Sequence, residues 1–164
     1  MFDHLDCTKV DDVVTMLNML YASEIISAQQ YWSHANDISG MYSVSIQQML
    51  NAHAEEEMEH AAKLRTQIHN LGGVLTNRLE TMLRLNPTPD SDKDVQVLRP
   101  SGSALVDAEK MLQDDLMGEE QAILNYKEAC RKVVVQDPGT YVILAEILND
   151  EYDHAQEIKN LLAM

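Results

Sequence analysis

The sequence contains the pattern Glu-x-x-His twice, once before the middle of the chain and once near its end. Glu57 precedes His60, and Glu151 precedes His154. Both copies lie in segments whose apolar residues recur at helical spacing, and residues three apart on a helix project from the same face. Each pair can therefore place one carboxylate and one imidazole at a single point inside a helical bundle, which favours a metal site there.

A further glutamate precedes each pair at nearly the same distance. Glu24 lies 33 residues before Glu57 (57 − 24), and Glu119 lies 32 residues before Glu151 (151 − 119). A tyrosine follows each of these glutamates after seven residues, which is about two helical turns. These tyrosines are Tyr31 and Tyr126. The chain therefore reads as two similar helix pairs in tandem, and each pair supplies three candidate ligands to a two-metal site.

Apolar periodicity predicts four long helices and no strand. The first helix starts after Thr8 as N-cap and runs towards Gly40, and the second runs from Ile46 to Leu71, before Gly72 and Gly73. The third helix follows a Ser103 cap and runs towards Val133. The fourth helix opens at Asp137-Pro138 and runs nearly to the terminus.

The connections between these helices are short, long and short. The long connection carries an amphipathic stretch from Asn77 to Leu85, closed by the residues Asn86-Pro87-Thr88-Pro89. This order predicts two antiparallel hairpins joined by one crossover that contains a short helix. We expect an all-α four-helix bundle that forms a single domain over residues 1–164.

The four glutamates fall on the helix faces that carry leucine, isoleucine and valine. Burying a carboxylate without a partner costs roughly several kcal/mol of free energy, and four carboxylates around one point would repel one another. Two divalent cations would offset these charges. Oxygen and imidazole ligands without a thiolate suit iron or manganese, although zinc also accepts them. The residues thus predict a di-metal centre capable of redox chemistry with dioxygen or peroxide.

Composition restricts the function classes. The net charge of −15 argues against a surface that binds nucleic acid, and no basic tail is present. The acidic start of the chain contains no signal-like apolar run, and no segment is long and apolar enough to span a membrane. A soluble, cytoplasmic protein is the expectation.

Two cysteines, Cys7 and Cys130, are too few for a disulfide framework or a four-cysteine metal site. Free thiols are the simpler interpretation. Cys130 follows Glu119 by about three turns on the same predicted face, so a redox role near the metals is the alternative.

Three segments together resemble the helix signatures of bacterioferritins: residues 24–35 (EIISAQQYWSHA), 56–61 (EEMEHA) and 150–154 (DEYDH). The resemblance implies a ferritin-like fold with an intrasubunit di-iron centre. It implies terminal ligands at Glu24 and Glu119, bridging carboxylates at Glu57 and Glu151, nitrogen ligands at His60 and His154, and a catalytic tyrosine, Tyr31, beside the centre. Glu119 is preferred to Glu120 because residues 115–119 (DLMGE) are similar to the family pattern.

The resemblance also bears on assembly. The chain ends ten residues after His154, without a fifth helix like that of 24-subunit bacterioferritins. The short helix in the crossover is instead similar to that of Dps-type mini-ferritins, which form twelve-subunit shells. A homo-oligomeric shell of twelve subunits is therefore expected, and a 24-subunit shell is less favoured.

Two other residues gain a possible role from this resemblance. Met58 stands where bacterioferritins carry a haem ligand at a two-fold subunit interface, and the alternative is an ordinary interface methionine. His53 lies one turn before Glu57, where it would either help iron move inward or serve as a satisfied histidine.

The predicted function is ferroxidase activity with iron storage: Fe(II) is oxidised by O2 or H2O2, and Fe(III) is kept in a hollow shell. One alternative is a di-iron or manganese redox enzyme that consumes peroxide without storing metal. Another is a Dps-type protein that shields DNA, which the charge disfavours. Whether an electron donor such as a ferredoxin takes part is left open.

Overall fold

The computed structural model describes residues 2–39, 43–85 and 104–163 of the chain, and within these ranges all regular structure is helical. The long helices are α1 (Val10–Asp37), α2 (Ser43–Asn70), α4 (Ala104–Val133) and α5 (Pro138–Leu162), and the short one is α3 (Leu79–Leu85). The predicted all-α class is confirmed. The short helix begins two residues later than expected, at Leu79 instead of Asn77.

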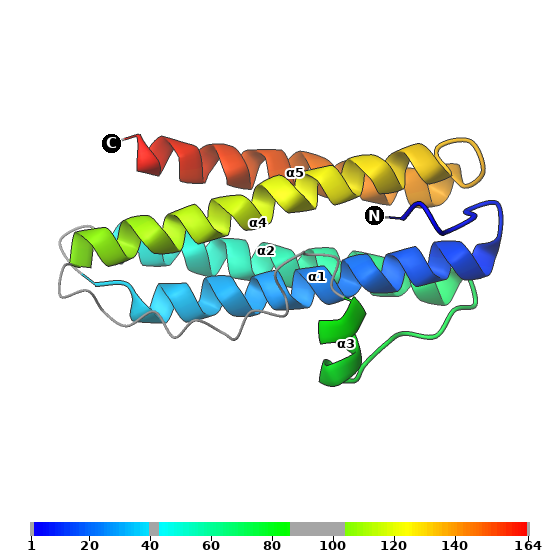
Figure 1. Ribbon diagram of the computed structural model, residues 1–164, viewed down its shortest axis with the longest axis horizontal. Helices are drawn as coiled ribbons and strands as arrows, with labels where there is room; N and C mark the ends of the chain where they lie inside the picture. Colours follow the sequence, from blue (N-terminus) through cyan, green and yellow to red (C-terminus); the bar gives the residue numbers. More distant parts are fainter. Residues whose placement is uncertain (1, 40–42, 86–103, 164) are drawn as a thin grey trace.

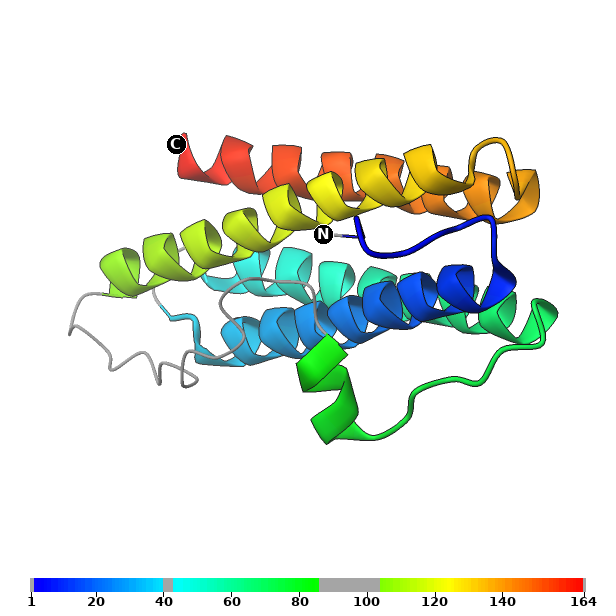
Figure 2. The ribbon, with the colours of Figure 1, turned by 45° about the vertical axis from the view of Figure 1, so that its right-hand side comes forward.

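The long helices form a four-helix bundle of two antiparallel hairpins. α1 packs mainly on α2, and α4 packs mainly on α5. The α2–α4 connection brings α3 against the outside of α1 (Figure 1). The N-terminal segment runs back along the bundle between α1 and α4 (Figure 2), where the Phe2 amide donates to Glu128 Oε1 at 2.6 Å. The predicted bundle with one long crossover is therefore confirmed.

Three helix starts were predicted from capping residues. Two of them lie among the described residues, and one of these two predictions was wrong. Lys9, not Thr8, occupies the N-cap of α1, and its side chain makes no capping hydrogen bond. The Thr8 amide and hydroxyl both donate to Asp6 Oδ1, the hydroxyl at 2.7 Å, so Thr8 belongs to a turn that precedes the helix. Asp137 does cap α5, because its Oδ1 accepts the Thr140 amide at 3.0 Å.

The other helix ends agree closely with the predicted stops. α1 ends at Asp37, shortly before Gly40. α2 ends in a Schellman turn, in which the Gly73 amide donates to the Ile68 carbonyl and Gly72 adopts a φ of 75°. The predicted Ser103 cap and the stop at residues 86–89 lie outside the described residues.

Apolar side chains form two buried clusters, one towards each end of the bundle, and a polar layer separates them. The first cluster includes Phe2, Leu17, Leu64, Tyr126, Val133 and Leu144, and the second includes Tyr31, Ile46, Leu50, Leu112 and Ile158. Since each of the four long helices contributes to both clusters, its middle turns must pass through the polar layer. These turns carry the predicted ligands.

Cys7 and Cys130 are both free thiols in the first apolar cluster. Burial raises the pKa of both thiols, which favours the protonated, less reactive form. The predicted redox role of Cys130 has no support from this position.

None of the helices in the described ranges combines the length and the apolar character needed to cross a bilayer.

Candidate metal centre

All six predicted ligands meet in the polar layer at the middle of the bundle. Every one of them is buried, with at most 3% of its surface exposed. The set comprises Glu24 on α1, Glu57 and His60 on α2, Glu119 on α4, and Glu151 and His154 on α5. Each long helix thus contributes at least one ligand, as the two tandem halves of the sequence predict.

The six residues divide into two overlapping groups of four. Within each group, one potential ligand atom from every residue lies within 4.8 Å of the others. One group holds Glu24, Glu57, His60 and Glu151, and the other holds Glu57, Glu119, Glu151 and His154. Glu57 and Glu151 belong to both groups. Two neighbouring metal ions that share these two carboxylates would fit this arrangement.

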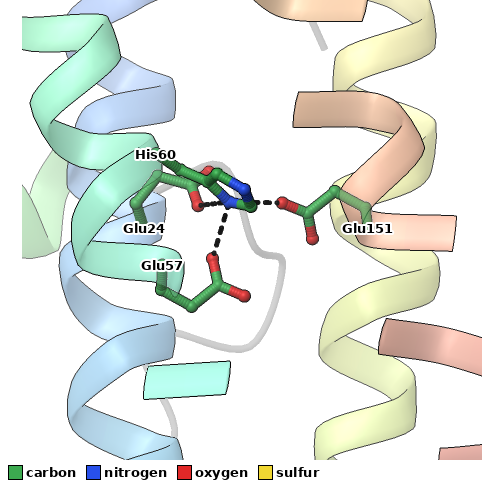
Figure 3. A group of neighbouring side chains, drawn as sticks. All are labelled: Glu24, Glu57, His60 and Glu151. Atoms are coloured by element: carbon green, nitrogen blue, oxygen red, sulfur yellow. Dashed lines mark ion pairs between the residues drawn. The ribbon is translucent and has the colours of Figure 1, made fainter. Parts of the chain in front are cut away.

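The first group is arranged around His60. Its Nδ1 atom lies 3.4 Å from Glu24 Oε2, 3.5 Å from Glu57 Oε2 and 3.2 Å from Glu151 Oε1. Figure 3 shows these three carboxylates directed at the same ring nitrogen, with Glu151 reaching across from α5. A cation at this point would have oxygen ligands from three helices and one imidazole nitrogen.

The second group repeats the arrangement around His154. Its Nδ1 atom lies 3.2 Å from Glu57 Oε1 and 3.8 Å from Glu119 Oε1. The planes of the two imidazole rings are inclined by 27°, and their centroids lie 6.0 Å apart. The centre therefore has an approximate two-fold arrangement that relates the α1–α2 hairpin to the α4–α5 hairpin.

A second carboxylate holds the outer nitrogen of each histidine. His60 Nε2 lies 3.1 Å from Asp150 Oδ2, and His154 Nε2 lies 2.8 Å from Glu56 Oε2. Each carboxylate comes from the opposite hairpin. Such contacts fix the orientation of a ligand ring and leave Nδ1 to face the metal. Neither residue was predicted from the sequence, although each directly precedes a predicted glutamate ligand.

The two tyrosines are paired across the bundle. The Tyr31 hydroxyl donates to Glu119 Oε1, and the Tyr126 hydroxyl donates to Glu24 Oε1 at 2.5 Å. Each tyrosine therefore bonds the glutamate of the other hairpin, although sequence spacing grouped it with the glutamate of its own helix. Burial and the nearby carboxylates raise the pKa of both phenols, so both remain neutral donors.

The pKa values of the candidate ligands reflect the close approach of several buried carboxylates. Burial and the Glu57 carboxylate raise the pKa of both Glu24 and Glu151 well above the ordinary value. Burial opposes charge on His154, yet contacts with the Glu119 and Glu57 carboxylates raise its pKa to about 11. The pKa of His60 is raised by its carboxylate neighbours in the same way. Bound protons therefore neutralise part of the negative charge of the carboxylates, a role that bound cations can also fill.

Several buried atoms that face the centre lack a hydrogen bond to any described residue. They are Glu57 Oε1, His60 Nδ1, Glu119 Oε2, Glu151 Oε1 and His154 Nδ1. Buried polar atoms without hydrogen bonds are rare, and a bound ion is one explanation for them. The residues present can therefore hold a metal ion.

The remaining predicted residues lie around the centre. His53 stacks on His154 with ring centroids 4.1 Å apart, and its Nε2 lies 3.1 Å from Glu157 Oε2. Met58 is 51% exposed on the outside of α2. Its predicted haem ligation would require a second subunit and stays a prediction.

An open acidic pocket of about 340 Å³ adjoins the centre between α2 and α5. Its lining includes the outer carboxylates Glu56 and Asp150, the predicted ligand His60, the exposed Glu59 and the half-buried Lys63. The pocket thus connects the outer carboxylates with the surface.

Comparison with known proteins gives one family and several structural neighbours. A family model described as a ferritin-like domain matches residues 14–164. The curated proteins contain no match to the chain. Among solved structures, the bacterioferritin-related dodecameric thioferritin of Bacteroides fragilis is 25% identical with a TM-score of 0.79, covering 94% of this chain and 86% of that chain.

Two further solved structures show the same fold at lower identity. A ferritin-like, diiron-carboxylate protein from Bacillus anthracis is 23% identical with a TM-score of 0.74, covering 93% of this chain and 96% of that chain. Dps from Listeria monocytogenes is 13% identical with a TM-score of 0.82, covering 92% of this chain and 93% of that chain.

Proposed function

The chain belongs to the family of ferritin-like domains, and we propose that it is a ferroxidase that also stores iron. Its ferritin-like and Dps-type relatives support a role in iron storage or protection against oxidation. One observation carries the more specific proposal: two four-residue groups of potential ligands share Glu57 and Glu151. That arrangement suits two metal ions held close enough to react with one oxidant.

In this proposal the two ions are substrate iron. Glu24 and His60 hold one Fe(II), Glu119 and His154 hold the other, and Glu57 and Glu151 lie between them. Four carboxylates balance the charge of two divalent ions, so binding removes the repulsion that raises the pKa of Glu24 and Glu151 in the metal-free protein. The imidazole nitrogens add ligands that suit iron and leave Nε2 for the outer carboxylates.

The reaction balances with two electrons. Two Fe(II) become two Fe(III), and the electrons with two protons reduce O2 to H2O2, or H2O2 to two water molecules. The chain holds the two ions together and excludes bulk water from them, since every predicted ligand is buried. The acidic pocket beside His60 offers carboxylates to iron that leaves the centre. The mineral would collect in a homo-oligomeric shell, proposed to be dodecameric like the Bacteroides fragilis relative.

Removal of a shared carboxylate tests the proposal. In Glu57→Ala or Glu151→Ala, the initial rate of Fe(II) oxidation should fall by a factor of about 100 or more, because both ions lose a ligand. Ferric absorbance after rapid mixing of metal-free protein with Fe(II) in air measures this rate. Glu146→Ala is the matched control, because Glu146 is exposed on α5, the helix of Glu151, and does not line the acidic pocket. Wild-type rates in both ligand variants would refute the proposed centre.

Tyr31 is proposed as a residue that takes part in the oxidation, and Tyr126 offers a control for it. Tyr31→Phe and Tyr126→Phe each remove one buried hydroxyl that bonds a glutamate ligand. A purely structural role predicts similar losses in both. A larger fall in oxidation rate in Tyr31→Phe, at equal metal affinity of the two variants, would support the assignment. Equal rates would contradict it.

A further inference from the structure

A second polar cluster lies between α1 and α4, beside the candidate metal centre. It consists of Asp115 on α4 with Gln30 and His34 on α1. Gln30 Nε2 donates to Asp115 Oδ1 at 2.8 Å, and His34 Nδ1 lies 2.8 Å from the same oxygen. Asp115 precedes Glu119 by one helical turn, and Gln30 directly precedes Tyr31. The cluster therefore adjoins the Glu119 side of the centre.

The Asp115 carboxylate is buried but only half satisfied. Its side chain has 0% exposure, and its second oxygen, Oδ2, has no hydrogen-bond partner among the described residues. A buried carboxylate oxygen without a partner is costly, because it has lost its hydration. The contacts with Gln30 and His34 satisfy the hydrogen-bonding capacity of Oδ1, but they leave Oδ2 without a partner. A cation held by this carboxylate would use it.

The surroundings of the cluster favour a cation and give it a way in. His34 is slightly exposed, with 13% of its side chain accessible, so the cluster reaches the surface. The charges of Asp114 and Asp37 also act on His34. Negative charge at the mouth of a site raises the local concentration of cations.

The donor atoms are also suitable. They are a carboxylate, an imidazole and the Gln30 side-chain amide, whose oxygen and nitrogen can exchange places by rotation. Oxygen and imidazole donors suit divalent ions of the first transition series, Fe(II) included.

We propose that Asp115, His34 and Gln30 form a third cation site, at which a divalent ion such as Fe(II) binds before it reaches Glu119. The use of the site for Fe(II) delivery rests on the proposed function, whereas the binding of a divalent ion does not. The site lies near Asp37, the last residue of α1, and next to Asp114 on α4, one helical turn before the predicted ligand Glu119.

Cobalt titration of the metal-free full-length protein tests the binding step. Co(II) absorbance and bound metal should give three tight sites per subunit in the wild type. Asp115→Asn keeps the size of the side chain and an acceptor for His34, yet should bind the third ion at least about tenfold more weakly. Glu109→Gln removes an exposed charge from the same helix and should retain all three sites.

Two further measurements guard against a folding defect and against surface binding. His34→Gln alters a partly exposed residue and should lose the same third ion. Anomalous scattering from cobalt-soaked crystals should give a peak within bonding distance of Asp115. The proposal is wrong if the third ion is absent from the wild type, or if Asp115→Asn and His34→Gln bind it with unchanged affinity.

Iron oxidation then separates this proposal from the proposed function. Asp115→Asn should oxidise Fe(II) about tenfold more slowly at low iron and near the wild-type rate at saturating iron, because only delivery is impaired. A third cobalt ion in a wild-type protein without oxidation would overturn the ferroxidase proposal alone. Rapid oxidation without a third ion, and unchanged in Asp115→Asn at all iron concentrations, would overturn the third site alone.

Discussion

Each histidine of the candidate centre contacts carboxylates through both ring nitrogens. On the inner side, Nδ1 faces the predicted glutamate ligands, and on the outer side Nε2 meets Asp150 or Glu56. The outer carboxylates are partly exposed, at 42% for the Asp150 side chain and 52% for the Glu56 side chain. Their value for stability is therefore small, and their main effect is on the orientation and basicity of the rings.

Loss of an outer carboxylate should weaken metal binding more than folding. In Asp150→Asn or Glu56→Gln, the affinity for Co(II) at the candidate centre should fall by a factor of about 10 to 100. The free energy of unfolding of the metal-free protein should change by less than about 1 kcal/mol, because these groups are partly solvated. Calorimetric titration with Co(II) and denaturant unfolding measure the two quantities.

Glu55→Gln is the control for these variants, because Glu55 is exposed and adjacent to Glu56. Its Co(II) affinity should equal that of the wild type. An equal loss in Glu55→Gln would mean that general charge, not the contact with His154 Nε2, controls the affinity.

At the scale of the helices, two glycines differ in backbone conformation, so alanine should have opposite effects at the two positions. Gly72 ends α2 with a φ of 75°, whereas Gly118 lies inside α4 beside the predicted ligand Glu119. A Cβ atom would meet nothing within 4 Å at either position, so only backbone preference decides the effect of alanine. Gly72→Ala should destabilise the protein by about 1 kcal/mol, since alanine avoids positive φ.

Gly118→Ala should instead stabilise the metal-free protein by about 0.5 to 1 kcal/mol, because alanine favours the helix interior. Denaturant unfolding of both variants at one pH measures the difference. Stabilisation by both substitutions would show that the Schellman turn does not limit the end of α2.

The burial of the candidate ligands was predictable because helical periodicity records which face of a helix is buried. Glu57 and Glu151 share that face with apolar residues of their own helices, so their burial could be read from the sequence. Periodicity does not record which residues lie opposite one another. The contacts of Glu56, Asp150 and Asp115 depend on the neighbouring helix, and they were therefore missed.

Helix ends show the same limit of sequence-based prediction, here for contacts between residues close in the chain. Asp137 and Gly72 act as predicted because the capping interaction involves only residues next to the helix end. Thr8 does not cap the helix because it lies in a local turn, in which its amide and hydroxyl donate to Asp6. Residue preference identifies a possible cap, whereas the local hydrogen bonds decide which residue is used.

For the whole molecule, the charged centre makes stability depend on pH. In the metal-free protein the pKa values of Glu24, Glu151, His60 and His154 are raised. A group with a raised pKa binds more protons in the folded state, so its stabilising contribution falls as the pH rises above its unfolded value. For His154 this window extends from the ordinary 6.5 to about 11. The lowered pKa of Glu57 acts only in acid, below its ordinary 4.5.

The metal-free protein should therefore melt at a lower temperature at about pH 9 than at about pH 7. Calorimetry at both pH values measures this difference. His154→Gln should reduce it, because that variant lacks one of the groups that bind protons on folding. Bound Co(II) should oppose it, since metal binding releases protons and strengthens as the pH rises. Equal melting temperatures of the wild type at both pH values would contradict the proton uptake.

Storage is a property of the assembly, and it separates the proposed function from a redox enzyme that stores no metal. The two ligand groups in each subunit can account for two ions, and the proposed third site for one more. Any larger amount of retained iron requires an enclosed mineral. We expect the chain to elute near twelve times its 18.5 kDa mass and to retain far more than three iron ions per subunit after aerobic addition of excess Fe(II).

Size separation followed by measurement of iron and protein in the shell fraction tests this expectation. Glu57→Ala should assemble normally yet accumulate little mineral at early times, because it oxidises Fe(II) slowly. Retention that stops near two or three ions per subunit in an intact wild-type shell would identify a di-metal redox enzyme without storage. The same limit in a wild-type protein that elutes as a single chain would instead trace the loss of storage to the lack of an enclosed cavity.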